Sequence, residues 1–211
     1  MIAMPQAPAC CPPLFTACRE VVLASASPRR QQFLREWGLA FRVVRPKGVE
    51  PKPAPGEPPD SYALRAAMAK AEAGRALALE GVLIAADTVV ALEGDILGKP
   101  HDDAEALHML YRLRGREHTV TSAVSLLWDG QTEHFSDSAH VRFHNWDDAT
   151  LAAYVATGEP RDKAGAYAIQ GQGAFLASGI QGSWATVVGL PVGLLAQRLL
   201  RHGLVTPATP L

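Results

Sequence analysis

The sequence predicts an α/β fold: a mixed, twisted sheet with flanking helices, an inserted antiparallel hairpin and a cleft between two lobes. Short apolar runs typical of buried strands alternate along the chain with segments of helical periodicity. Residues 118–128 and 132–143 read as strands on either side of Asp129-Gly130, a dipeptide that favours a hairpin turn. A hairpin among strands joined by helices predicts both antiparallel and parallel pairing.

The first strand and helix are predicted within residues 21–38. Residues 21–24 are apolar, and Ser27 followed by Pro28 is typical of a helix start, because proline lacks the N–H that would have no partner there. Apolar residues then recur at helical spacing until Gly38, which favours the helix end.

A proline-rich loop is predicted after a second strand at residues 39–44. Residues 45–59 hold six prolines and exceed an ordinary connection, which favours a binding loop. Asp60 or Ser61 is expected to begin an Ala-rich helix that continues to about Leu79.

The central strand is expected to end at Asp87. Residues 82–86 form a continuous apolar run, and residues 89–92 form another after Asp87-Thr88. Further helices are expected at residues 102–115, 147–158 and 191–201, and the Gly-rich stretch 161–190 is expected to combine loops with short strands.

Composition excludes several classes of protein. With 20 Lys+Arg against 21 Asp+Glu, the net charge of −1 lacks the basic excess of a protein that binds a nucleic-acid polymer. The longest uncharged apolar stretch, residues 184–196, is shorter than the ~18–20 residues of a membrane span. We therefore expect a cytoplasmic globular protein with neither a nucleic-acid polymer nor a membrane as partner.

The N-terminal segment is expected to differ from the rest. Residues 1–18 contain four prolines and are predicted to be a poorly ordered extension, whereas residues 19–205 are predicted to form one domain. All three cysteines, Cys10, Cys11 and Cys18, lie in the extension without CxxC spacing. This usage predicts neither a disulfide framework nor a zinc site and favours the cytoplasm.

Residues 25–30 (SASPRR) are the strongest chemical signal. The predicted helix start offers free backbone N–H groups and a partial positive charge, which together attract anions. Ser27, Arg29 and Arg30 supply a hydroxyl and two guanidiniums suited to phosphate oxygens. The alternative is an ordinary capped helix with two solvated arginines.

Asp87 is the second signal. Its expected position at a strand end is where open α/β sheets keep their sites. A carboxylate in apolar surroundings is costly unless it is paired, hydrogen-bonded or bound to a cation. We interpret Asp87 as a metal ligand or general base; the alternative is a turn or a structural ion pair.

Lysines complete the candidate site. Only five occur, and three of them lie in compact settings, within AMAKA, GKP and DKAGAY. Several convergent cations are the usual means of holding a triphosphate. The sequence contains no GxxxxGK[ST], HExxH or GxSxG motif, so these familiar chemistries are excluded. The candidate phosphate-binding lysines are Lys70, Lys99 and Lys163.

Five motifs, in this order, resemble the Maf family of nucleoside triphosphate pyrophosphatases. The resemblance covers about residues 21–200 and implies the Maf-like, ITPase-like fold. It further implies a cytoplasmic homodimer that uses Mg²⁺ or Mn²⁺ to cleave a nucleotide to the monophosphate and pyrophosphate. The motifs are LASASPRR (23–30), ADTVV (86–90), GKP (98–100), DKAGAYAIQG (162–171) and VVGLP (187–191).

The resemblance also implies roles for individual residues. Asp87 matches the catalytic acidic residue, taken as proton acceptor, which acts on water either directly or through the metal. Glu50 falls where the family keeps another metal-site carboxylate, although here Pro51 follows it. Phosphate-binding positions of the family match Arg29, Arg30, Lys70 and Lys99.

Three positions separate two branches of the family. Arg29, Thr88 and Gln170 match the dTTP/UTP branch, whereas the 7-methyl-GTP branch typically has Trp, Gln and Glu there. Gln170 carries both a donor and an acceptor, which suit the edge of uracil or thymine. The implied function is hydrolysis of dTTP, UTP and related pyrimidine nucleotides, modified ones included, in a house-cleaning or nucleotide-pool role.

Two alternatives stay open at the level of sequence. One is a nucleotide-binding regulator of cell division or septum formation without significant turnover. The other is a pyrophosphatase directed at 7-methyl-GTP or other purines. Two further departures from the family pattern are Ala26, where glycine is common, and Thr186, where asparagine is common.

Overall fold

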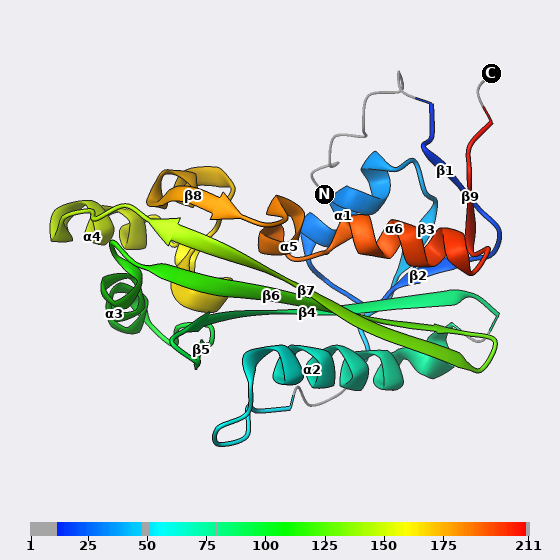
Figure 1. Ribbon diagram of the computed structural model, residues 1–211, viewed down its shortest axis with the longest axis horizontal. Helices are drawn as coiled ribbons and strands as arrows, with labels where there is room; N and C mark the ends of the chain where they lie inside the picture. The colour runs from blue at the N-terminus through cyan, green and yellow to red at the C-terminus, as the bar shows by residue number, and fades with distance from the viewer. Residues whose placement is uncertain (1–11, 48–50, 79, 210–211) are drawn as a thin grey trace, which may run out of the picture.

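The main sheet combines parallel and antiparallel pairing. The computed structural model describes residues 12–47, 51–78 and 80–209 (Figure 1). Within these residues the sheet comprises β2 (Val21–Leu23), β3 (Phe41–Val43), β4 (Val82–Leu92), β5 (Asp95–Leu97), β6 (Glu117–Trp128), β7 (Gln131–Phe143) and β8 (Ala177–Gln181). Their order is β3-β2-β4-β6-β7-β8, with β5 beside β4. β2 is parallel to β3 and β4, and the remaining pairs are antiparallel.

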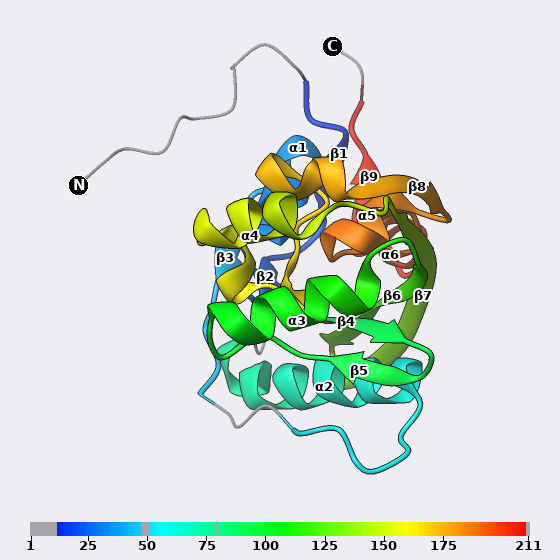
Figure 2. The ribbon, with the colours of Figure 1, turned by 90° about the vertical axis from the view of Figure 1, so that its left-hand side faces the viewer.

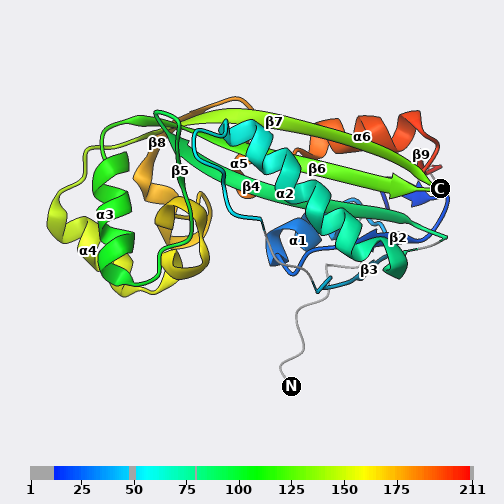
Figure 3. The same ribbon diagram turned by 90° about the horizontal axis from the view of Figure 1, so that it is seen from below.

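Helices cover both faces of this sheet. The α-helices of the described chain are α1 (Pro28–Glu36), α2 (Pro59–Gly74), α3 (Asp103–Leu113), α4 (Asp148–Ala156), α5 (Trp184–Val188) and α6 (Val192–Arg201). α2 lies along one face, and α1, α5 and α6 lie on the other (Figures 1 and 3). α3 packs against α4 at one end of the long strands. The twisted mixed sheet with flanking helices confirms the predicted fold class.

Alternation along β4 builds a core on each face. Val82, Ile84 and Ala86 belong to a cluster with buried residues of α1 and α6. Leu83 and Ala85 instead pack with Ala71 of α2. Because successive side chains of a strand point to opposite faces, the next two residues of β4 are also directed to opposite faces.

β4 is longer than the sequence predicts. Asp87 does not end the strand: β4 runs over eleven residues, and residues 83–91 pair with β6 without interruption. The strand that ends near Asp87 is the neighbouring β2, which pairs only with residues 82–84 of β4. Further along the same edge, β5 pairs with residues 90–92. The structure therefore corrects the expected strand end to a gap of residues 85–89 along one edge of β4.

A second sheet involves the N-terminal segment. β1 (Phe15–Ala17) pairs antiparallel with β9 (Val205–Pro207). Phe15 is buried and meets the ring of Trp37 edge to face, with ring centroids 5.3 Å apart. The expectation of a poorly ordered extension over residues 1–18 is thus wrong for residues 15–17; residues 1–11 lie outside the described chain.

The predicted hairpin is confirmed. Asp129 and Gly130 both have positive φ angles, 46° and 73°, as a type I′ turn requires, and Trp128 pairs with Gln131 across it. α2 begins slightly earlier than expected, at Pro59, and a short 3₁₀ turn, η1 (Arg75–Leu77), follows it. None of the helices in the described chain combines the length and apolar character needed to cross a membrane.

The Gly-rich stretch is built mainly from tight turns. Before β8 and α5 it forms the short 3₁₀ segments η2 (Glu159–Asp162), η3 (Ala164–Ala166) and η4 (Gly171–Leu176). Gly165 has a φ of 69°, and a Cβ atom there would lie 2.8 Å from Val90 Cγ1. Glycine at this position therefore lets the loop approach β4 just beyond the gap.

Candidate active site

A cavity of about 1110 Å³ lies along the gap in the edge of β4. Residues 87–90 of β4 contribute to its wall, as do residues 24–30 before and within α1. Segments far apart in the sequence supply the rest: the proline-rich loop, α2, residues 96–99, residues 162–170 and residues 187–189. Because β2 and β5 leave this stretch of β4 uncovered, groups from both faces of the sheet reach one space.

The start of α1 forms one wall of the cavity. Ser27 is the N-cap, as predicted: its hydroxyl oxygen accepts a hydrogen bond from the Arg30 backbone N–H at 3.5 Å. The Ser25 hydroxyl accepts from the Ser27 N–H at 3.2 Å. Pro28 occupies the first turn, where its lack of an N–H costs nothing. A helix N-terminus therefore faces the cavity, as the sequence predicts for an anion site.

Asp87 and Lys70 meet at the opposite wall. The Lys70 ammonium donates to Asp87 Oδ1 at 2.5 Å, and the two side chains are 28% and 8% exposed, respectively. Asp87 projects from the α2 face of β4, and Lys70 lies one turn before the end of α2. The ion pair compensates the burial of the carboxylate, and both residues line the cavity.

Arg30 reaches the other face of β4. Its guanidinium donates to the backbone oxygens of Ala86 at 2.7 Å and Gly189 at 2.8 Å, and to the Thr88 hydroxyl at 2.9 Å. It also contacts Ser25 Oγ at 3.3 Å. Arg30 is thus at the cavity, as expected for a phosphate-binding residue, but several of its donors are bonded to the protein itself.

Arg29 differs from its neighbour. It lines the cavity, and its Nε atom is buried without a hydrogen-bond partner in the described part of the chain. Its positive charge acts on Asp162: burial raises the pKa of that carboxyl, but the Lys163 hydrogen bond and the charges of Lys163 and Arg29 outweigh burial and lower it. A guanidinium with an unsatisfied buried donor is suited to an anionic ligand.

Lys99 and Lys163 come from two motifs that the fold joins. The Gly165 N–H donates to the Gly98 oxygen at 3.0 Å, so the GKP and DKAGAY segments lie side by side. Lys99 is exposed and Lys163 half-buried, and both line the cavity. The Lys163 ammonium also bonds the Asp162 carboxylate and the Glu159 backbone oxygen.

Gln170 lines the cavity beside a tightly held turn. The Glu159 carboxylate accepts hydrogen bonds from the N–H groups of Gln172 at 3.1 Å and Gly173 at 2.8 Å. Gly171 has a φ of 72°, and a Cβ atom there would lie 2.4 Å from Glu159 Oε1. Glu159 therefore fixes the turn that follows Gln170, a function that no motif or spacing in the sequence predicts.

Of the two predicted metal-binding carboxylates, only Asp87 lies among the described residues. Asp87 lies at the cavity, whereas Glu50 lies outside the described residues. No group of three or more His, Cys, Asp and Glu side chains suited to a metal ion occurs within residues 12–47, 51–78 and 80–209.

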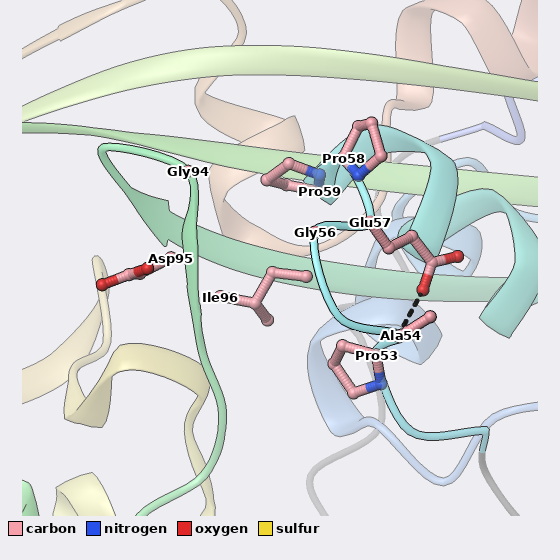
Figure 4. Close-up of a pocket in the computed structure, with 9 residues that line it drawn as sticks. All are labelled: Pro53, Ala54, Gly56, Glu57, Pro58, Pro59, Gly94, Asp95 and Ile96. Carbon is pink, nitrogen blue, oxygen red and sulfur yellow. Dashed lines mark hydrogen bonds between the residues drawn. The ribbon is translucent and has the colours of Figure 1, made fainter.

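The proline-rich loop borders the cavity, as predicted for a binding loop. Arg65 of α2 donates to the Lys52 oxygen at 2.9 Å and forms two hydrogen bonds with the Glu57 carboxylate, at 2.6 and 2.8 Å. The Tyr62 hydroxyl donates to the Pro51 oxygen at 3.0 Å. On its other side the loop faces the β4–β5 turn across a smaller cavity of about 460 Å³ (Figure 4).

A buried histidine supports the wall near Gln170. His118 of β6 lies 2.8 Å from the Tyr167 hydroxyl, measured from Nε2, and is only 2% exposed. Burial lowers the pKa of His118 to about 4, so its ring is neutral at pH 7. Tyr167 lines the cavity. The sequence does not predict this pair, because a single histidine on an apolar strand carries no distinctive pattern.

Known proteins match this sequence over most of its length. The family model described as Maf-like protein matches residues 20–202. A curated dTTP/UTP pyrophosphatase of Nitratidesulfovibrio vulgaris is 51% identical over 192 residues, which cover 90% of this chain and 91% of the relative. Another, from Oleidesulfovibrio alaskensis, is 50% identical over 197 residues, or 92% and 90% of the two chains.

A third dTTP/UTP pyrophosphatase, from Aromatoleum aromaticum, is 43% identical over 197 residues that cover 87% of this chain and 95% of the relative. The family match spans all five motifs and every described candidate residue of the cavity. The chain therefore belongs to the Maf family.

Proposed function

We propose that this protein hydrolyses dTTP, UTP and related pyrimidine nucleotides, modified ones included, to the nucleoside monophosphate and pyrophosphate. The observation that carries the proposal is one cavity in which the Asp87–Lys70 pair faces a helix N-terminus and Arg29. Relatives that are 43–51% identical over most of the chain bear the name dTTP/UTP pyrophosphatase. The role that follows is house-cleaning of the nucleotide pool, in the cytoplasm.

The triphosphate binds at the basic wall. Arg29 offers its guanidinium, whose Nε has no hydrogen-bond partner among the described residues, and the start of α1 offers the positive end of the helix dipole. Lys99 and Lys163, at the joined motifs, add positive charge to the lining of the same cavity. Convergent cations of this kind neutralise the charge that develops on a pyrophosphate leaving group.

The donor set fits Mg²⁺ or Mn²⁺. Magnesium is typically held by one or two carboxylates together with substrate phosphate oxygens. Asp87 supplies such a carboxylate at the cavity wall, and Glu50 is the expected second one. A bound cation would neutralise charge on the attacked phosphate.

Asp87 orients the attacking water and accepts its proton on a carboxylate oxygen. Lys70 holds the Asp87 side chain in place through the 2.5 Å hydrogen bond to Oδ1. The Asp87 carboxylate is 8% exposed, so little bulk water competes with the bound water molecule. No covalent intermediate is needed, because pyrophosphate leaves once its charge is neutralised.

Gln170 reads the base. Its amide presents one acceptor and a donor, the pattern that the Watson–Crick edge of uracil or thymine complements. The turn after it is fixed by Glu159, so the amide is presented from a rigid position. We also propose that the protein works as a homodimer, as the family resemblance implies.

A nucleotide panel tests the function. Pyrophosphate release is measured from dTTP, UTP, CTP, GTP, ATP and 7-methyl-GTP, each with Mg²⁺, with Mn²⁺ and with a chelator. We expect dTTP and UTP to be the best substrates and the chelator to abolish turnover. Binding without release from any nucleotide would instead support the regulatory alternative, and preference for a purine would support the other branch. Light scattering of the same sample measures the oligomeric state.

A further inference from the structure

The buried hydroxyl of Ser122 belongs to a series of hydrogen bonds that begins at Arg30 and ends at the backbone oxygen of Thr186. Ser122 is on β6, directly opposite Thr88 in the register of the sheet, and is fully buried. The two hydroxyl oxygens are 2.9 Å apart. Ser122 does not line the cavity, so it has no direct route to a substrate.

The hydrogen bonds of this series are all donated in one direction, from Arg30 toward Thr186. Arg30 has only N–H donors, so its Nη2 atom donates to the Thr88 hydroxyl oxygen at 2.9 Å. The Ser122 hydroxyl donates to the backbone oxygen of Thr186 at 2.8 Å. Since that spends the one hydrogen of Ser122, Thr88 is the donor in the contact between the two hydroxyls, whose oxygens at 2.9 Å are closer than the Thr88 hydroxyl and its other acceptor, the Gly189 oxygen at 3.3 Å. Aligned donors of this kind polarise and strengthen one another.

This series of hydrogen bonds fixes the walls of the cavity relative to one another. Through Arg30 it ties the start of α1 to the Ala86 oxygen, next to Asp87, and to the Gly189 oxygen. Through Ser122 it ties the same strand to Thr186, one turn earlier in the segment that leads to Gly189. Only the backbone oxygen of Thr186 takes part; its side chain bonds Asp137 of β7 instead.

We propose that Ser122 and Thr88 are positioning residues that brace Arg30, and that Thr88 influences the reaction through Arg30 and not by contact with the base. This inference rests on the proposed pyrophosphatase function. It divides the arginine pair: Arg29 contacts the triphosphate, whereas Arg30 holds the anion-binding helix start, the strand of Asp87 and the Gly189 turn in register.

Three variants and one matched control test the brace. Thr88→Val keeps the shape but removes the hydroxyl, Thr88→Ser restores it, and Ser122→Ala removes the next link. Ser125→Ala is the control, because Ser125 is an equally buried serine of β6 whose hydroxyl has no partner in the described chain. Each variant is assayed for kcat and KM with dTTP, UTP and CTP.

We expect Thr88→Val to lower kcat/KM by about ten- to a hundredfold, the range of a hydrogen bond to a charged group, and by the same factor for every nucleotide. Ser122→Ala should lose about three- to tenfold, Thr88→Ser should recover most of the activity that Thr88→Val loses, and Ser125→Ala should stay within about twofold of the parent protein. A change in the ratio between nucleotides would show that Thr88 reads the base and would overturn the proposal. Equal losses in Ser122→Ala and Ser125→Ala would overturn it as well.

A second readout separates this inference from the proposed function. Calorimetry measures the affinity of the same proteins for inorganic tripolyphosphate, which needs no turnover. We expect affinity to fall in Thr88→Val and Ser122→Ala but not in Ser125→Ala. If the parent protein released no pyrophosphate from any nucleotide, the proposed function would fail, while this pattern of affinities would still support the brace; unchanged affinity in all variants would refute it.

Discussion

At the scale of single residues, Asp87 is a buried carboxylate that pairs with Lys70 and lines the cavity. Its isosteric replacement is therefore informative. We expect Asp87→Asn to fold, because Lys70 is 28% exposed and can stay hydrated, yet to lose about a hundredfold or more in pyrophosphate release. The amide neither accepts the proton nor holds a cation well. Circular dichroism checks the fold, and near-normal turnover would contradict the assignment.

Gln170 offers a test of base choice. In Gln170→Glu a carboxylate, which has no N–H donor, replaces the amide. We expect turnover of dTTP and UTP to weaken relative to 7-methyl-GTP, as measured by the ratios of kcat/KM. Gln172→Glu is the matched control, since Gln172 is exposed and does not line the cavity. An unchanged preference in Gln170→Glu would rule out its role in reading the base.

His118 makes stability depend on pH. Its pKa is about 4 in the folded protein and about 6.5 in an unfolded chain, so between these values only the unfolded state binds the proton. Stability is therefore complete above pH 6.5 and falls by about 3 kcal/mol as the pH drops to 4. We expect His118→Gln to lose this contribution. Urea unfolding of both proteins from pH 7 to pH 4 measures the difference, and parallel curves would contradict it.

Residue chemistry was partly readable from the sequence. The helix cap at Ser27 follows from local pattern, and the structure shows it. The partners of Arg30 could not be predicted, because the oxygens of Ala86 and Gly189 are backbone atoms 56 and 159 positions away and carry no side-chain signal. Local sequence patterns predict a helix start, but they do not reveal which of the two arginines donates to backbone oxygens of the protein.

At the scale of elements, β4 shows why a polar pair is a weak sign of a strand end. Asp87 and Thr88 interrupt the apolar run, yet pairing with β6 passes straight through them. Both side chains are satisfied by partners on opposite faces, Lys70 and Arg30, so the strand continues. The sequence predicts a site near residue 87, and Asp87 lines the cavity, although the element that ends beside this part of β4 is β2.

The proline-rich loop is an element held from outside by α2. Arg65 bonds the Lys52 oxygen and the Glu57 carboxylate, and its hydrogen bond, followed by that of the Ala54 N–H, lowers the pKa of Glu57 to about 2. We expect Arg65→Met to raise KM for dTTP about three- to tenfold while kcat stays within about twofold, because the change loosens the border of the cavity and leaves the Asp87–Lys70 pair itself in place.

Amide hydrogen exchange provides a structural readout for the same variant. The Ala54 N–H donates to Glu57 Oε2 at 2.9 Å, so its exchange should accelerate when Arg65 no longer holds that carboxylate. Arg75→Met is the control, because Arg75 pairs with Glu72 on the surface beyond the end of α2. Unaltered exchange and KM in Arg65→Met would mean that the loop keeps its place without the clamp.

At the scale of the whole molecule, the cavity lies where two cores meet. One cluster of buried residues includes α1 and α6, and the other includes α3 and α4. Ile169, next to Gln170, packs against both. Figure 2 shows α1 and α2 on opposite sides of the strands, with α3 between them in this view. The alternation of elements predicted this architecture, but the gap along β4 depends on strand lengths that the sequence pattern did not reveal.

A ligand that joins these parts should stabilise the whole chain. The test ligand is a dTTP analogue with a methylene group between the α and β phosphates, which resists cleavage. At a concentration 100-fold above its Kd, such a ligand stabilises the folded state by about 2.7 kcal/mol, equivalent to an increase in Tm of about 5–10 °C for a chain of this size. We expect the full increase only when Mg²⁺ is present, because Asp87 is the proposed carboxylate ligand.

Asp87→Asn separates the two contributions. In this variant the analogue should still raise Tm through Arg29 and the helix start, but added Mg²⁺ should bring no further increase. Differential scanning fluorimetry with the analogue alone, Mg²⁺ alone and both together measures each part. An equal effect of Mg²⁺ in the parent protein and the variant would place the metal away from Asp87, and the cavity would then bind the polyphosphate without the proposed carboxylate.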